Sequence, residues 1–131
     1  MKDVEPRHVS NSDALQMEAI ASFIAYYGWR QVIAIYTDDD FGTNAITSLG
    51  DALENLGSHI IQKAALLPSS NNTMIGTILS NLASTQTRIF VVHMPQYLAF
   101  SLFSEAKYLG MMSAGYVWIV SDSTIGTLNS S

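Results

Sequence analysis

The stretch Tyr26 to Asn44 reads YYGWRQVIAIYTDDDFGTN and decides the fold. Residues Val32 to Tyr36 form an unbroken apolar run rich in β-branched and aromatic side chains, which is typical of a strand covered on both faces. Gly28 precedes the run and suits the end of a helix, because glycine readily takes the left-handed conformation found there. The acidic loop that follows leads toward a second helical pattern. This stretch therefore predicts a helix–strand–helix unit around a buried parallel strand.

Three further runs are expected to form strands, at Ile60–Leu67, Ile89–His93 and Tyr116–Val120. The four runs start at Val32, Ile60, Ile89 and Tyr116, and these starts are 28, 29 and 27 residues apart. That spacing fits a strand plus the helix that crosses to the next parallel strand. The order α-βα-βα-βα-β predicts the α/β class with a doubly wound parallel sheet.

Amphipathic patterns fill every interval between the expected strands. The first helix should bury one face, and Asp13 with Gln16 fits a capping box at its start. The next helices should end near Gly57 and Gly110, with another after the Ser/Asn loop at 69–72. The stripe expected to face the core from the first helix comprises Leu15, Ala19, Ile20, Phe23, Ile24 and Tyr27.

Composition narrows the function classes. The chain has 131 residues, a net charge of −5 and six scattered basic residues. This length suits one domain or one lobe, and the absence of a basic stripe argues against nucleic-acid binding. There is no cysteine, and no apolar run approaches the roughly 20 residues that cross a bilayer. We expect no signal peptide, no membrane contact and no cofactor in these residues. Two sequons, at Asn71 and Asn129, predict glycosylation acceptors.

The polar residues that could bind a ligand or a metal ion gather where the expected strands end. Parallel strands bring their carboxyl ends to one edge, and the first helix should begin at that same edge. Asp38, Asp39 and Asp40 either bind Mg²⁺ or an ammonium group, or form a solvated loop whose last Asp caps the next helix. Asp13 either caps its helix or takes a ligand's amino group. His93 is expected to be packed or hydrogen-bonded rather than a metal ligand.

Catalytic motifs are absent from the sequence. It contains no P-loop, nucleophile elbow, H-E-x-x-H or G-x-G-x-x-G pattern. A receiver domain would carry a further Asp at the end of the third strand, where this chain has His93 and Met94. The sequence therefore favours a binding protein over an enzyme.

Several motifs in order resemble one known family. The chain reads SDALQMEAIA from Ser12, YYGWRQVIAIYTDDDFGTN from Tyr26, TRIFVVH from Thr87 and AKYLGMMSAGYVWI from Ala106. These are similar to the second lobe of the type I periplasmic-binding-protein fold in the receptor family, and most similar to plant glutamate-receptor-like channels. The resemblance covers residues 10–131, with residues 1–9 as a divergent N-terminal segment.

The resemblance implies an extracellular ligand-recognition region, one lobe of a clamshell that closes on an amino-acid-like molecule. In relatives, the counterparts of Asp13, Phe41 and Asp122 face the ligand, with tyrosine usual at the position of Phe41. It further implies that the first lobe and the channel lie outside these residues, and that the whole receptor is an oligomer at the plasma membrane. Two alternatives stay open: a subunit-assembly module that binds no ligand, and a metal-dependent α/β enzyme that uses Asp38–Asp40.

Overall fold

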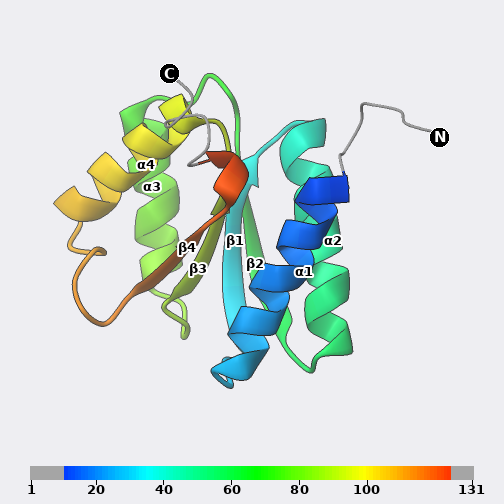
Figure 1. Cartoon of the computed structure of the whole chain (residues 1–131). Coiled ribbons are helices and arrows are strands. Elements are labelled where there is room, and N and C mark those ends of the chain that lie inside the picture. The colour runs from blue at the N-terminus through cyan, green and yellow to red at the C-terminus, as the bar shows by residue number, and fades with distance from the viewer. Residues whose placement is uncertain (1–10, 125–131) are drawn as a thin grey trace.

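The computed structural model describes residues 11–124 of the chain, and its helices and strands alternate throughout (Figure 1). In chain order the elements are α1 (Asn11–Tyr26), β1 (Gln31–Thr37), α2 (Asp40–Asn55), β2 (His59–Leu66), α3 (Asn72–Ala83), β3 (Ile89–His93), α4 (Gln96–Tyr108) and β4 (Val117–Val120). This is the predicted element order.

The four strands form one sheet in the order β2-β1-β3-β4, and every neighbouring pair is parallel. Ile33 of β1 lies opposite Phe90 of β3, and Phe90 lies opposite Trp118 of β4. The α/β class with a doubly wound parallel sheet is thereby confirmed.

Helices cover both faces of the sheet, with α1 and α2 on one side and α3 and α4 on the other (Figure 1). Alternate residues of β1 point to opposite faces, so Val32 and Ala34 join the α1–α2 core while Ile33 and Ile35 join the α3–α4 core. Each face of the sheet therefore has its own apolar layer, and the sheet separates the two layers.

The central strands are buried as predicted. Ile35 and Val91 have no exposed surface, and neither do their neighbours Ala34 and Val92. The fourth strand contacts both apolar layers, with Trp118 and Val120 on one side and Ile119 on the other. All four residues of β4 are only half-buried, because β4 is an edge strand with a neighbour on one side only.

The helix ends follow the glycines. Gly28, Gly57 and Gly110 come just after α1, α2 and α4, with φ of 76°, 85° and 77°. These left-handed conformations strain any residue with a Cβ, so the predicted terminations are confirmed. None of the helices within residues 11–124 is long and apolar enough to span a membrane.

The orientation of α1 differs from the prediction. Its core-facing side chains include Met17 and Ala21 beside the expected Ile20 and Ile24. Leu15 and Phe23 are instead 63% and 45% exposed. The helix is apolar on two adjacent faces, and the periodicity did not distinguish the face that packs against the sheet from the one beside it.

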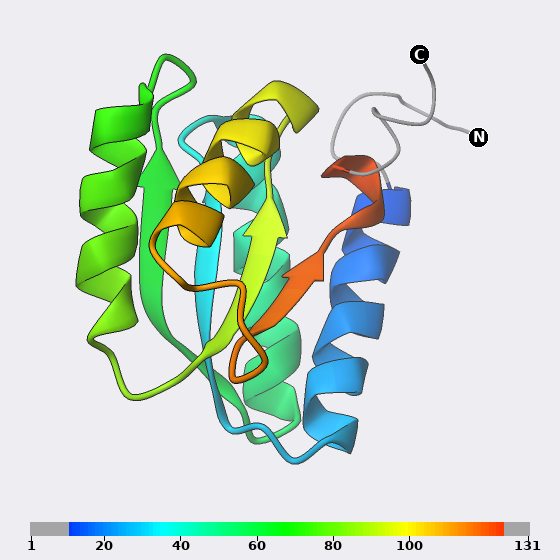
Figure 2. The same ribbon diagram turned by 90° about the vertical axis from the view of Figure 1, so that its left-hand side faces the viewer.

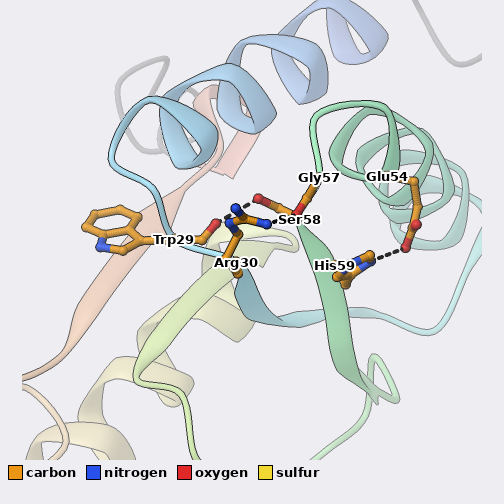
Figure 3. Close-up of polar contacts among 6 residues, drawn as sticks. All are labelled: Trp29, Arg30, Glu54, Gly57, Ser58 and His59. Atoms are coloured by element: carbon orange, nitrogen blue, oxygen red, sulfur yellow. Dashed lines mark hydrogen bonds and ion pairs between the residues drawn. The ribbon is translucent and has the colours of Figure 1, made fainter.

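Polar contacts join the turns at the amino edge of the sheet (Figure 3). The Ser58 hydroxyl donates to the Trp29 carbonyl at 2.7 Å, and Arg30 Nη1 donates to the Gly57 carbonyl at 3.4 Å. His59 Nδ1 lies 2.7 Å from a carboxylate oxygen of Glu54. The first two contacts tie the turn after α1 to the turn after α2, and the third joins the start of β2 to the end of α2.

Candidate functional site

The candidate site lies at the carboxyl edge of the sheet, where three chain segments meet. The first turn of α1 lies beside the end of β4 and the short turn that follows it (Figure 2). The loop from β1 to α2 reaches the same edge, because β1 and β4 run in the same direction. Residues far apart in the sequence therefore become neighbours here.

Two short hydrogen bonds join α1 to the turn after β4. The backbone N–H of Asp122 donates to Gln16 Oε1 at 2.7 Å, and the Ser123 hydroxyl donates to Asp13 Oδ1 at 2.7 Å. The predicted capping box of Asp13 and Gln16 was wrong. Asp13 lies inside the first turn of a helix that begins at Asn11, and Gln16 contacts the turn after β4.

An open groove of about 520 Å³ runs along α1 beside β4. Its polar end carries side chains from both segments, and its apolar wall consists mainly of α1 side chains. The polar lining residues are Asp13, Gln16, Asp122 and Ser123, and the apolar ones are Leu15, Ala19, Ile20, Phe23 and Ile119. A groove of this kind suits a small ligand with a charged end and an apolar part.

The acidic loop serves mainly to start α2. Asp39 has extended backbone and accepts a hydrogen bond from the Gly42 N–H at 2.9 Å, so it is the N-cap. The prediction that the last Asp, Asp40, would cap the helix was wrong by one residue, because Asp40 is already in the first turn. Across residues 11–124, no group of three or more His, Asp or Glu is arranged to hold a metal ion.

Phe41 and His93 form a stacked pair at the same edge. Their ring centroids are 4.2 Å apart with 22° between the planes. Phe41 is 37% exposed, whereas His93 is fully buried at the end of β3. Burial lowers the pKa of His93 below the ordinary value of 6.5, while the charges of Asp13 and Asp39 and the backbone of Phe41 act in the opposite direction. His93 was expected to be packed or hydrogen-bonded, and it is both.

The predicted site residues thus fall into two groups. Asp13 and Asp122 line the same groove. Phe41 lies against His93 and is not among the residues that line the groove. Asn71 is exposed and caps α3 by accepting from the Met74 N–H at 2.9 Å. Its glycosylation stays a prediction. Asn129 lies outside the described residues.

Sequence reasoning missed the residues that assemble the rim. The local pattern predicts only a capping role for Gln16, and it marks Ser121 and Ser123 only as polar residues at the end of a strand. Ser123 bonds a residue 110 positions away, so no local pattern signals the contact. A serine directly after Asp122, at the end of a strand, was the one available hint of a polar turn.

The arrangement suits binding better than nucleophilic catalysis. Ser121 Oγ lies 2.7 Å from His93 Nδ1, which is the spacing of a nucleophile and its base. Both residues have no exposed surface, so a substrate cannot reach the hydroxyl. At the surface, the Asp122 carboxylate beside an apolar wall offers a place for a cationic group instead.

Comparison with known proteins gives a consistent result. Residues 7–131 match the family model described as the receptor family ligand binding region. The chain is 46% identical over 113 residues to glutamate receptor 3.4 of Arabidopsis thaliana, covering 86% of this chain and 12% of that protein. It is 41% identical over 111 residues to glutamate receptor 3.1 of Oryza sativa subsp. japonica, covering 85% and 12%. The chain therefore spans about an eighth of the length of these relatives.

A solved structure shares the fold. The solute-binding protein of an ABC transporter from R. palustris, in complex with 4-hydroxybenzoate, superposes with a TM-score of 0.77. The match covers 86% of this chain and 30% of that one, at 14% sequence identity. At that identity the likeness shows a periplasmic-binding-protein-like fold and nothing about the ligand.

Proposed function

Because this chain belongs to the receptor family of ligand-binding regions, with plant glutamate receptors among its relatives, we propose that it recognises a small amino-acid-like ligand at the rim formed by α1, the β1–α2 loop and the turn after β4. The ligand's ammonium group pairs with Asp13 and Asp122, and its side chain lies along the apolar wall of α1. Phe41 contacts the ligand from the first turn of α2.

The single observation that carries this proposal is the hydrogen bond from Ser123 to Asp13. It holds two carboxylate-bearing segments together at the polar end of an apolar groove. An amino acid with an apolar side chain has the same two-part character, a charged head and an apolar body. Charge-assisted hydrogen bonds to such a head contribute about 1.5–3 kcal/mol each.

The wider setting is also part of the proposal. The region acts as one lobe of an extracellular clamshell, and ligand binding shifts an equilibrium between open and closed forms of the longer receptor. It is not an enzyme. A second lobe supplies the opposite wall of the site, so these residues alone bind weakly.

A second candidate function is a subunit-assembly module. The observation that favours it is the exposed apolar face of α1, where Leu15, Phe23 and Tyr27 are 63%, 45% and 54% exposed. Exposed apolar patches of this kind often mark protein interfaces. A chain that dimerises through this face and binds no amino acid would support assembly over recognition.

Replacing Asp13 with asparagine tests the recognition proposal. The amide keeps an oxygen that accepts from Ser123 but loses the charge, so we expect amino-acid affinity to fall by about tenfold or more. Isothermal titration with the amino acid that binds the unmodified chain most tightly, chosen from the twenty standard ones, measures the change. Asp51→Asn is the matched control, because Asp51 is an exposed acid on α2 that does not line the groove. Equal affinities in the two variants would contradict the role of Asp13.

A further inference from the structure

His93 contacts both sides of the candidate rim through one buried imidazole. Its ring stacks on Phe41, which lies in the first turn of α2. Its Nδ1 lies 2.7 Å from Ser121 Oγ, which begins the turn after β4. The β1–α2 loop and the β4 turn follow strands that are not neighbours in the sheet, because β3 lies between β1 and β4. The end of β3 is therefore where the two sides connect.

A chain of buried hydrogen bonds extends the connection through the turn. Ser121 Oγ lies 2.9 Å from Thr124 Oγ1, and Thr124 Oγ1 accepts from the Met94 N–H at 3.1 Å. Ser121 and Thr124 are both buried, whereas Asp122 and Ser123 between them are not. The turn thus presents Asp122 and Ser123 to the groove while its two ends are fixed to β3.

One ring nitrogen of His93 is buried without a hydrogen-bond partner within residues 11–124. Among the described residues its Nε2 is buried without a hydrogen bond of good geometry, although the Phe41 backbone favours a proton on the ring. Burying a polar atom without a partner is costly. The imidazole is therefore not explained by packing alone.

We propose that His93 is a positioning residue of the rim, whose neutral imidazole holds Phe41 and the Asp122–Ser123 turn in one arrangement, and that this arrangement changes when the ring is protonated. That the rim recognises a ligand rests on the function proposed above. The positioning role concerns only the residues of this chain, and it is tested without a ligand.

Protonation would disturb both contacts. The charged groups that act on the ring are Asp13 from α1 and Asp39 from the β1–α2 loop, and the β4 turn contacts the ring through the Ser121 hydroxyl. A protonated ring carries hydrogen on both nitrogens, so Nδ1 must donate to Ser121 and Nε2 needs an acceptor beneath Phe41. The Ser121 hydroxyl must then accept from the ring, and the Nε2 proton must reach the Phe41 backbone, so both sides of the rim respond to protonation.

The direction of the pH effect follows from the environment. Burial lowers the pKa of His93 in the folded chain, so the unfolded chain takes up its proton first as the pH falls. The stabilising contribution of neutral His93 is complete above about pH 6.5 and is lost as the pH falls through the folded-state pKa.

Amide NMR of the full 131-residue chain between about pH 8 and pH 5 tests the proposal. We expect the Cε1–H signal of His93 and the amide signals of Phe41, Asp122 and Ser123 to titrate with one shared midpoint below 6.5. The His59→Asn variant, which changes an exposed histidine at the amino edge, should keep this transition. Rim amides that titrate with a different midpoint from His93, or that do not move when His93 titrates, would overturn the proposal.

Two substitutions separate the contacts. His93→Phe keeps a ring beneath Phe41 but loses the bond to Ser121, so the Asp122 and Ser123 amides should shift most. His93→Asn keeps a polar group near Ser121 but loses the ring, so the Phe41 amide should shift most. Both should abolish the pH transition at the rim. If either variant does not fold, the shared midpoint in the unmodified chain still decides the question, and a failed amino-acid titration would count only against the proposed function.

Discussion

Replacing Gly42 with alanine is expected to lower the free energy of unfolding by about 3 kcal/mol, the upper part of the range for overpacking. Gly42 lies in the first turn of α2, where the helix meets the end of β1. A Cβ at this position would collide with the Thr37 carbonyl oxygen and lie only 2.9 Å from the Thr37 nitrogen. These are backbone atoms of a buried strand, so no side-chain rotation relieves the clash. Chemical denaturation monitored by circular dichroism measures the loss.

Gly50→Ala is the matched control for this prediction. Gly50 lies in the interior of the same helix, and its nearest contact would be Ile60 Cδ1 at an ordinary 3.6 Å. Alanine there should stabilise the chain by about 0.5–1 kcal/mol, because it restricts the unfolded backbone without a clash. Equal effects of the two substitutions would show that the close approach of α2 to β1 is wrong.

Replacing Phe90 with alanine should cost about 3–5 kcal/mol, as for other fully buried aromatic side chains. Phe90 has no exposed surface and stacks on Trp118 of β4 with ring centroids 4.5 Å apart. Because β4 is an edge strand that pairs only with β3, this stack adds to the backbone pairing that holds β4 in the sheet. Thermal unfolding should show the loss, and the amides of Asp122 and Ser123 should exchange faster because β4 carries their turn.

Phe100 provides the comparison for Phe90. It lies on α4 and is 58% exposed, so Phe100→Ala should change stability by no more than about 0.5 kcal/mol. A large loss at Phe100 with a small loss at Phe90 would contradict the assignment of the α3–α4 core.

Much of the fold could be predicted because its signals are local. Continuous apolar runs identified β1 and β3, and the glycines marked the ends of three helices. The burial of β4 could not be predicted in the same way, because it depends on how many strands lie beside it. The face of α1 that meets the core was also ambiguous, since Met17 and Phe23 lie on adjacent apolar faces.

The candidate site was less predictable than the fold. Topology indicated that Asp13 and Asp122 would share one edge, and the structure places both in one groove. The bonds that join their segments involve Gln16 and Ser123, whose partners are more than 100 positions away. Asp13 satisfied a local capping pattern equally well, and only the tertiary packing of α1 against the β4 turn shows that its carboxylate accepts from Ser123.

Mapping amide shifts on titration with amino acids is the measurement that tests the central claim most directly. Two charge-assisted bonds and one aromatic contact, set against the cost of association, predict an affinity on the order of millimolar or weaker, so the titration should extend to tens of millimolar. We expect at least one of the twenty standard amino acids to shift the amides of Asp13, Phe41, Asp122 and Ser123 together. No shift with any amino acid, or shifts confined to α3 and α4, would contradict recognition at this rim.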